Sequence, residues 1–309
     1  MQTILGANGQ IGRELARELK QNFTSDIRLV SRNPQKINDT DTLMSANLLD
    51  ADQTRDAVAG SDIVYLTAGL PMDTERWIRE WPPIMKNVID ACAFHKVKLV
   101  YFDNTYMYPQ TDTPQTEDTP FKPHGDKGRI RGAITGQLLE AMSAGRVEAL
   151  ICRAPEFYGP GQTQSIINGL VLDALVAGKK PKVFLRDDTK RTLIYTPDAS
   201  RAMALLGNTP DAYGQTWHLP CDDNRPTYKE FIRLAADAYR RPYEYTVLKP
   251  WLLWIAAKFN PQRRDASELL PRYKQDNIFV SDKFKKRFPD FKVTTFSEGL
   301  KATAAEQKH

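Results

Sequence analysis

The chain begins with a short apolar strand that runs directly into three regularly spaced glycines, and this combination constrains the fold more than any other part of the sequence. Residues 3–5 form the strand, and the glycines are Gly6, Gly9 and Gly12. Glycine lets the backbone turn tightly out of the strand, approach a pyrophosphate closely and bring the following helix against the sheet. Apolar residues then recur at helical spacing at Ile11, Leu15, Ala16 and Leu19. A strand, glycine loop and helix in this order predict a dinucleotide site in which the helix N-terminus binds the phosphates.

The residues about twenty positions past Gly12 indicate which dinucleotide the loop binds, because a unit that prefers NAD carries an acidic residue there for the ribose 2′-hydroxyl. This chain has Ser31 and Arg32 instead. A hydroxyl group and a fixed cation suit a 2′-phosphate, so we predict NADP(H) as the preferred cofactor and NAD(H) as the alternative. In the other interpretation, Arg32 is simply a solvated residue after a strand.

A second apolar run supplies the opposite wall of the expected cofactor site. The run Asp62-Ile-Val-Tyr-Leu-Thr-Ala-Gly69 is mainly apolar and ends in the small residues Ala68 and Gly69, and small residues at the end of a strand let a ligand approach. The cofactor contacts expected from the glycine loop, the turn after residue 30 and this strand end are Gly6, Asn8, Gly9, Gln10, Ile11, Gly12, Ser31, Arg32, Ala68 and Gly69.

Length and composition exclude several other classes of protein. With 309 residues, 41% of them hydrophobic, the chain can bury a sizeable core. The formal charge of +5 comes from 43 basic and 38 acidic residues spread along the chain, so we expect no nucleic-acid surface. Three cysteines without a Cys-x-x-Cys motif predict reduced thiols in a cytoplasmic protein. No apolar run reaches the roughly 20 residues of a membrane span, and we expect no signal peptide before the first strand.

Apolar strands alternate with helical patterns along the first half of the chain, as is typical of an α/β fold with a doubly wound parallel sheet. Strands are expected at residues 3–5, 27–30, 63–67, 97–102 and 149–153, and helices at 77–95, 165–177, 231–239 and 251–259, with another opening at Asp198; residues 284–303 close the chain. We place a Rossmann-type dinucleotide-binding domain at residues 1–155, with returning segments near 190–220. A smaller substrate-binding lobe is expected mainly at residues 156–309.

Four segments occur in an order known from one protein family. They are the glycine triad, Asp62-Ile-Val-Tyr-Leu66, Arg153-Ala-Pro-Glu-Phe-Tyr-Gly-Pro-Gly161, and Arg191 followed by Pro197-Asp198. Together they resemble the extended short-chain dehydrogenase/reductase superfamily, in particular its NAD-dependent epimerase/dehydratase type. The resemblance covers most of the chain, and it implies a Rossmann-type fold, a nicotinamide cofactor and a homodimer.

The same resemblance implies where several residues lie. Pro155 and Glu156 would lie near the nicotinamide amide, and Arg191 near an anionic part of the substrate such as the diphosphate of a sugar nucleotide. Tyr106 and Tyr158 are further substrate contacts expected from their positions in the chain.

The catalytic motif of that family is altered here. Family members use a Tyr-x-x-x-Lys pair on one helix, whose four-residue spacing lets the cation lower the pKa of the phenol. This chain has Lys127-Gly-Arg-Ile-Arg131 at that place, so Lys127 replaces the tyrosine and Arg131 the lysine. The serine or threonine that accompanies the pair is replaced by Asn104, with Thr105 next to it.

Three interpretations of this change remain open. In the first, Lys127 is the acid/base, desolvated in a closed site and repelled by Arg131. In the second, Tyr106, Tyr108 or His124 supplies the proton. In the third, Lys127 and Arg131 only hold the ribose and phosphate of the cofactor, and no redox step occurs.

These alternatives give two leading hypotheses for function. The first is an NAD(P)-dependent oxidoreductase or epimerase/dehydratase that acts on a small carbonyl or hydroxyl compound, such as a sugar or sugar nucleotide. In it, Asn104 or Thr105 binds the reacting oxygen, Lys127 exchanges the proton and Arg131 supports it. The second is a non-catalytic NADP-sensing regulator. We expect no metal site, because the four histidines lack ligand spacing among themselves or with the cysteines.

Overall fold

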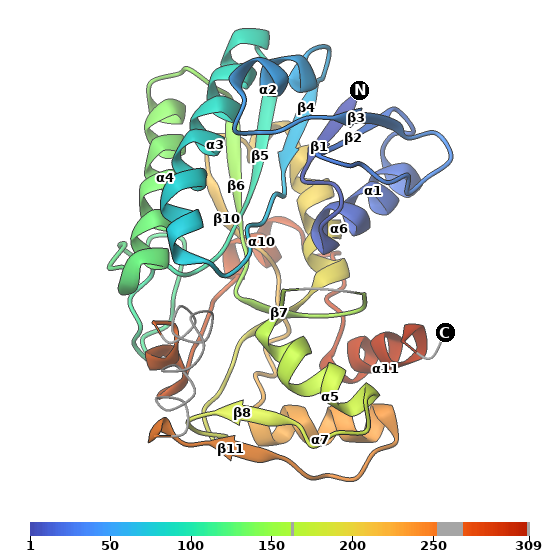
Figure 1. Cartoon of the computed structure of the whole chain (residues 1–309), viewed down its shortest axis with the longest axis vertical. Coiled ribbons are helices and arrows are strands. Elements are labelled where there is room, and N and C mark those ends of the chain that lie inside the picture. The colour runs from blue at the N-terminus through green and yellow to red at the C-terminus, as the bar shows by residue number, and fades with distance from the viewer. Residues whose placement is uncertain (162–163, 252–267, 308–309) are drawn as a thin grey trace.

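The computed structural model describes residues 1–161, 164–251 and 268–307. Its centre is a parallel sheet of seven strands in the order β10-β6-β5-β4-β1-β2-β3 (Figure 1). The strands are β1 (Gln2–Leu5), β2 (Ile27–Ser31), β3 (Thr42–Ser45), β4 (Ile63–Leu66), β5 (Lys98–Asp103), β6 (Ala149–Arg153) and β10 (Thr216–His218). The predicted Rossmann-type doubly wound sheet is therefore confirmed.

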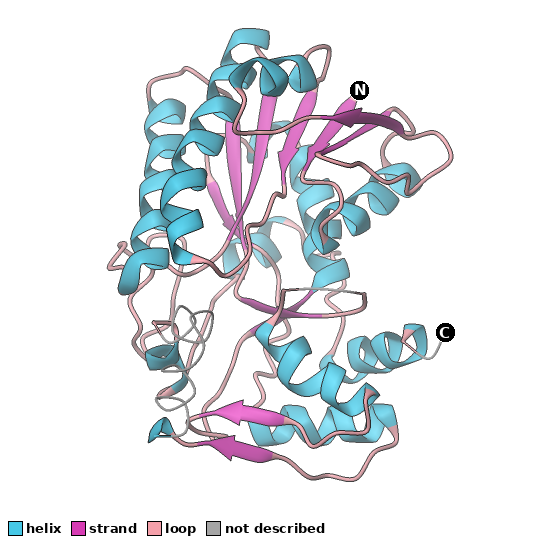
Figure 2. Ribbon diagram, viewed as in Figure 1, coloured by secondary structure: helices cyan, strands magenta, loops and turns pink. Residues whose placement is uncertain are grey.

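Helices cover both faces of this sheet (Figure 2). Helices α1 (Gln10–Asn22) and α6 (Thr196–Gly207) pack together on one face. Helices α2 (Ala51–Val58), α3 (Thr74–His95) and α4 (Gly125–Ser143) pack on the other. Each face has its own apolar core, and residues of β1, β4 and β6 contribute to both because alternate side chains of a strand point to opposite faces.

The strands predicted from apolar runs match β1, β2, β4, β5 and β6. The sequence did not predict β3, three of whose four residues are exposed at the edge of the sheet, or β10, which is only three residues long. Helix α6 and strand β10 both lie between residues 196 and 218 and belong to the layers of the N-terminal unit. The boundary between residues 155 and 156 stays a prediction.

The remaining elements form a smaller C-terminal region with its own apolar core. Strand β7 (Glu156–Tyr158) pairs with β9 (Leu193–Tyr195), and β8 (Lys182–Phe184) pairs with β11 (Thr246–Leu248). Around them lie η1 (Asn168–Leu172), α5 (Asp173–Val176), α7 (Tyr228–Tyr239) and α11 (Phe296–Glu306), with η3 (Leu270–Tyr273) as a single turn, whereas the single turn η2 (Pro210–Ala212) packs on α6 beside the large sheet.

Residues 284–303 close the chain. Two helices occur there, α10 (Asp282–Arg287) and α11, because Pro289 cannot continue α10 and Thr295 begins α11 with a capping box to Glu298. The helix predicted at residues 251–259 lies outside the described residues apart from Trp251.

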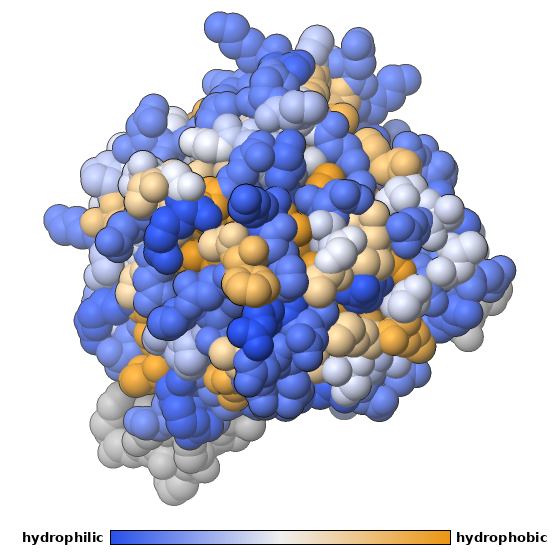
Figure 3. All heavy atoms as spheres, turned by 90° about the horizontal axis from the view of Figure 1, so that it is seen from above, coloured by the Kyte–Doolittle hydropathy of each residue, from blue (hydrophilic) through white to orange (hydrophobic). Residues whose placement is uncertain are grey.

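Within the described residues, no helix has both the length and the apolar character needed to cross a membrane. Figure 3 shows a face of the molecule on which hydrophilic side chains predominate, with apolar side chains scattered between them.

Candidate functional site

The glycine loop joins β1 to α1 at the carboxyl edge of the sheet. Gly6 has a φ of 90°, and a Cβ there would lie 2.5 Å from the Cα of Ala68, just beyond β4. A Cβ on Gly12 would lie 2.9 Å from the Cα of Ala7 and 3.0 Å from Thr67 Oγ1. Helix α1 has neither a side-chain cap nor an acidic residue in its first turn, so its amide groups and dipole favour an anion at the loop.

The side chain of Asn8 ties this loop to the turn that follows β2. Its Nδ2 donates to the carbonyl oxygen of Asn33 at 2.7 Å, and its Oδ1 accepts from the amide of Gln35 at 3.1 Å. Ser31 Oγ accepts from the amide of Asn33 at 3.2 Å. Arg32 is exposed on the same turn, and its side chain has no hydrogen-bond or ion-pair partner among the described residues. Its guanidinium group is therefore available to a ligand at the loop.

The other residues predicted at the cofactor follow neighbouring strands. Ala68 is half-buried and Gly69 exposed beyond β4, and Pro155 is buried beyond β6. Because the carboxyl ends of parallel strands share one edge of a sheet, these residues lie on the same side of the sheet as the glycine loop. Gly161 reaches this edge from the loop after β7, where a Cβ would lie 2.5 Å from Gln10 Oε1. Contact of each residue with the cofactor stays a prediction.

Lys127 lies in the first turn of α4 with its side chain fully buried. Its Nζ donates to Glu268 Oε1 at 2.9 Å and also to Thr74 Oγ1. Glu268 Oε2 accepts from the amide of Asp126 at 2.6 Å, so its carboxylate lies at the N-terminus of α4, where the helix dipole favours it. Gly125 leaves room for this carboxylate, since a Cβ there would collide with it. The predicted repulsion from Arg131 is therefore balanced by a carboxylate that the sequence did not indicate.

Arg131 lies one turn further along α4, and its guanidinium group points into the core between helices and sheet. It donates to the hydroxyl of Tyr101 at 2.5 Å and lies 3.9 Å from Asp103 Oδ1. The rings of Trp77 and Trp81 lie 5.0 and 4.3 Å from it, an arrangement that favours a cation over the ring faces. Lys127 and Arg131 thus occupy one helix face as the motif requires, but their charged groups have separate partners.

The loop after β5 carries the other predicted catalytic residues. Asn104 Oδ1 accepts from the amide of Tyr106 at 3.0 Å, which makes Asn104 the start of a turn. Thr105 is buried, and its Oγ1 accepts from Arg272 at 2.9 Å. The ring of Tyr106 stacks on Trp77 with centroids 6.2 Å apart. Burial raises the pKa of Tyr106, although the charge of Arg272 opposes the rise, so at neutral pH this phenol keeps its proton.

Arg191, the predicted substrate-anion contact, lies in a buried ion pair. It donates to Glu156 Oε2 at 3.0 Å and to the carbonyl oxygen of Arg272 at 2.7 Å. Glu156 also accepts from the hydroxyls of Tyr273 and Tyr228. Burial acts to raise the pKa of Glu156, but the charges of Arg191 and Arg272 outweigh it and hold this pKa below its usual range. The negative charge beside Arg191 therefore comes from the chain itself.

Tyr158, the other residue predicted at the substrate, is 1% exposed in the core of the C-terminal region. Its ring packs against Tyr195, Phe231 and Phe296, with centroids 5.5 to 5.6 Å away. A substrate contact by Tyr158 would require this aromatic core to open.

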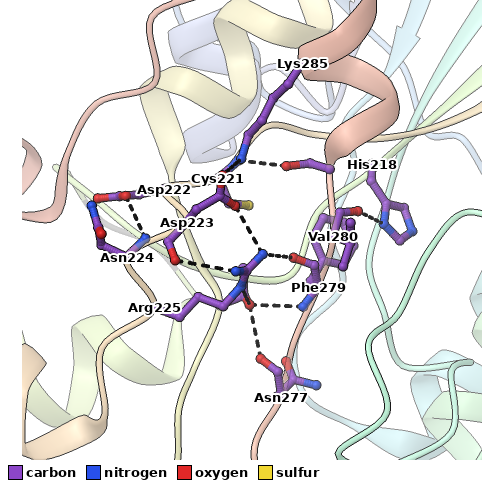
Figure 4. A network of polar contacts seen from close by, with 12 residues as sticks. His218, Cys221, Asp222, Asp223, Asn224, Arg225, Asn277, Phe279, Val280 and Lys285 are labelled. Carbon is purple, nitrogen blue, oxygen red and sulfur yellow. Dashed lines mark hydrogen bonds and ion pairs between the residues drawn. The ribbon is translucent and has the colours of Figure 1, made fainter.

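A second buried network begins at the end of β5 and runs under the site. Arg153 donates to Asp103 Oδ2 at 3.1 Å and to the hydroxyl of Tyr108 at 2.6 Å. That hydroxyl lies 2.7 Å from His218 Nε2, and His218 Nδ1 lies 2.7 Å from the carbonyl oxygen of Val280, seen beside it in Figure 4. Burial lowers the pKa of His218 to about 3, so the ring is neutral with its proton on Nδ1. Tyr108, the second alternative proton donor, is thus already fully hydrogen-bonded.

An open cavity of the described structure lies away from these residues. It has a volume of about 460 Å³ and is open to solvent, and Asp223 and Arg225, an ion pair at 3.2 Å, lie in its wall (Figure 4). No predicted cofactor or catalytic residue lines it. His124 is exposed at the N-cap of α4 without a capping hydrogen bond. The described residues contain no group of three or more His, Cys, Asp or Glu side chains suited to a metal ion.

Residues 3–219 match the family model described as the NAD dependent epimerase/dehydratase family. The chain belongs to this family. The match runs from the glycine loop to the end of β10, so it covers the whole seven-stranded sheet. Family membership confirms the resemblance seen in the sequence, the Rossmann fold and a nicotinamide cofactor, and it implies an enzyme.

Solved structures with the same fold include three family enzymes. A UDP-glucuronic acid 4-epimerase from Bacillus cereus in complex with NAD is 16% identical, with a TM-score of 0.80 over 100% of this chain and 99% of that one. The UDP-glucose 4-epimerase of Thermus thermophilus in complex with NAD is 14% identical, with a TM-score of 0.79 over 100% of this chain and 99% of that one. A dTDP-glucose 4,6-dehydratase double mutant from Streptomyces venezuelae is 14% identical, with a TM-score of 0.78 over 100% of this chain and 97% of that one. At these identities the likeness concerns the fold alone.

One curated relative is the uncharacterized protein y4nL of Sinorhizobium fredii (strain NBRC 101917 / NGR234). It is 28% identical over 140 residues, which are 45% of this chain and 38% of that protein. The match therefore spans well under half of the relative's own length.

Sequence reasoning missed two residues of the site, Glu268 and Arg272, and did not foresee the pairing of Glu156 with Arg191. Glu268 and Arg272 lie near the start of the last described range, residues 268–307, and neither belongs to a sequence motif. Only the fold brings them to residues 105 and 127, more than 140 positions earlier.

Proposed function

We propose that the chain is an NADP(H)-dependent oxidoreductase or epimerase/dehydratase that acts on a carbonyl or hydroxyl compound of the sugar or sugar-nucleotide class. The observation that carries this proposal is the position of Lys127 and Thr105 at the same sheet edge as an intact glycine loop. The likeness in fold to epimerases and a dehydratase of sugar nucleotides supports the substrate class.

The residues present fit a nicotinamide dinucleotide. The cradle around Gly6 and Gly12 has no space for side chains, and the uncapped N-terminus of α1 would hold the pyrophosphate. The unpaired guanidinium group of Arg32 would hold the 2′-phosphate of NADP(H). When bound, the nicotinamide ring accepts or supplies a hydride at the substrate carbon.

In this proposal the chain's own residues handle the oxygen and the proton. Thr105 binds the reacting oxygen, and Lys127 exchanges the proton with it. Lys127 forms an ion pair with Glu268, and an ammonium group is a proton donor of the kind that the reduction of a carbonyl needs. Arg131 has a supporting role, since it fixes the helix against Trp77, Trp81 and Tyr101.

Substitution of Lys127 tests the assignment. We expect K127M to lose turnover while it binds NADPH with an affinity within about threefold of wild type, because Lys127 does not touch the glycine loop. Lys122→Met is the matched control, since Lys122 is exposed and its side chain makes no described contact. Turnover is followed as NADPH oxidation, and as isomer formation from UDP-glucose and UDP-glucuronic acid. Full activity of K127M in a folded protein would refute the role of Lys127.

A second candidate function is a non-catalytic NADP-dependent regulator. It is favoured by the ion pairs of Lys127 and Arg191, each of which already holds a carboxylate of the chain. This alternative predicts NADPH binding without consumption of NADPH by any carbonyl compound. Turnover of one substrate by the wild-type protein would exclude it.

A further inference from the structure

The described residues include five buried cationic side chains, and all five lie around the candidate site: Lys127, Arg131, Arg153, Arg191 and Arg272. Four of them have a carboxylate within 4 Å. Glu268 pairs with Lys127, Asp103 lies beside both Arg131 and Arg153, and Glu156 pairs with Arg191. Arg272 alone has no such carboxylate among the described residues. Taking a guanidinium group out of water is costly unless it is paired, so this exception calls for an explanation.

The guanidinium group of Arg272 contacts the loop that carries the predicted catalytic residues. The side chain is 7% exposed, donates to Thr105 Oγ1 at 2.9 Å and lies 5.2 Å from the centre of the Tyr106 ring. Its Nε is buried and has no hydrogen-bond partner in the described structure. One donor of a permanent cation is therefore left unused beside Thr105.

A small polar cavity lies against these groups. It has a volume of about 10 Å³, room for a single oxygen atom, and Arg272, Thr105 and Tyr106 lie in its wall. The side chains of Gln110, Gln115 and Asn277 also line it, and each has a buried amide oxygen without a partner. The hydroxyl of an alcohol substrate can accept from Arg272 and donate to an amide oxygen, whereas the oxygen of a carbonyl substrate only accepts.

The position of Arg272 is fixed by the Arg191–Glu156 pair. Arg191 holds the carbonyl oxygen of Arg272 at 2.7 Å, and Glu156 accepts from the hydroxyl of the neighbouring Tyr273. The amide of Asn277 donates to the carbonyl oxygen of Lys190 at 2.9 Å, which ties the end of this segment to the same place. The paired Arg191 thus positions the segment that carries the unpaired Arg272.

We propose that Arg272, together with Thr105, binds the reacting oxygen of the substrate and stabilises the negative charge that develops on it. Because Thr105 accepts from Arg272, its own O–H is directed to a further acceptor, and the reacting oxygen receives one hydrogen bond from each. This role rests on the proposed function. As a carbonyl is reduced, a C–H bond forms with the hydride of NADPH, the π electron pair moves to the oxygen, and that oxygen then takes a proton from Lys127, which yields the alcohol and NADP⁺.

The test compares Arg272→Met, Arg272→Lys and Thr105→Val with a matched control, Lys274→Met. Lys274 is exposed on the same segment and its removal makes the same change in charge. Steady-state kinetics use whichever of UDP-glucose, UDP-glucuronic acid or a panel of small ketones the wild-type protein turns over. Thermal unfolding of all variants is measured without ligand.

We expect R272M to lower kcat by about 100-fold or more with KM within threefold, as for the loss of an oxyanion donor. T105V should show the same split, R272K should recover part of kcat, and K274M should equal wild type. R272M should unfold at the same temperature as wild type or higher, because it removes a buried charge that has no carboxylate within 4 Å among the described residues.

Two results would overturn the role of Arg272: a kcat of R272M within threefold of wild type, or a fall of several degrees in its unfolding temperature that R272K reverses together with activity. A wild-type protein that turns over none of the probes would instead refute the proposed function. In that case the unfolding temperature of R272M is compared with that of wild type, and a lower value for R272M would show that Arg272 has a structural role.

Discussion

Glu14 lies one turn into α1 with its carboxyl group buried between α1 and α6. It is bonded to the side chains of Gln10 and Thr196, and Ser200 lies 3.5 Å away. Burial raises the pKa of Glu14 to about 8 from its ordinary 4.5, although these hydrogen bonds and the charge of Arg17 oppose the rise. The folded protein therefore keeps Glu14 protonated at neutral pH, whereas the unfolded chain ionises it.

This difference makes stability depend on pH with a definite sign. Because the folded-state pKa is raised, the contribution of Glu14 to stability is fully present below about pH 4.5 and is lost as the pH rises to about 8. At about 1.4 kcal/mol for each pH unit, the loss is about 3 kcal/mol at pH 7 and about 5 kcal/mol above pH 8. Glu14→Gln keeps the shape and hydrogen bonds of the neutral acid and removes the ionisation.

We expect E14Q to unfold within about 2 °C of wild type at pH 5 and about 6 °C above it at pH 7, at about 2 °C per kcal/mol for a chain of this size. Thermal unfolding is measured from pH 5 to 8.5. Glu18→Gln is the control, since Glu18 lies one turn along the same helix and is bonded to Asn22 at the surface. Unfolding temperatures of wild type and E14Q that differ by the same amount at every pH would refute the reasoning.

Two further predictions concern the glycine loop. Gly6→Ala places a Cβ 2.5 Å from backbone atoms of Ala68 at a positive φ, so we expect a loss of about 2 to 5 kcal/mol in stability and of measurable NADPH binding. Gly136→Ala, with nothing within 4 Å of the new Cβ, should not destabilise, and normal NADPH binding by G6A would contradict the proposed cradle. Arg32→Gln should weaken NADPH binding about tenfold without changing NADH binding, as measured by fluorescence titration. Lys36→Gln on the same turn is its control, and equal losses for both dinucleotides would show that Arg32 does not bind the 2′-phosphate.

The parts of the fold that the sequence predicts are those defined by local pattern. In β1, the glycine loop and α1, an apolar run, three glycines and a helical period follow one another within twenty residues. Strands β4, β5 and β6 are also predicted from local pattern, because each is a mainly buried and apolar run. Strand β3 escapes such reasoning, because an exposed strand at a sheet edge shows no alternation of apolar and polar residues.

The charge pairs of the site could not be predicted because tertiary packing sets them. Lys127 and Glu268 are 141 positions apart, and nothing in either local sequence marks the other. Motif reasoning named Lys127, Thr105 and Arg191 as site residues, but it could not show which cations have a carboxylate beside them. Glu156 forms its ion pair with Arg191, so Arg191 already has a carboxylate beside it and Arg272 does not. The motif alone places Glu156 near the cofactor and does not reveal this pairing.

Helix α6 and strand β10 come late in the chain but complete the helix layer and the sheet of the N-terminal unit, and this has a consequence for how the protein forms during synthesis. Strand β6 has its outer neighbour only when residues 216–218 are present, and α1 has its covering helix only when residues 196–207 are. During synthesis the nucleotide-binding layers thus stay incomplete until about two-thirds of the protein has been made, and the residues of β7, β8 and β9 are made in between. The family's common segment ends at residue 219, one position past β10. The segment that matches the family model therefore includes the late helix and strand that complete these layers.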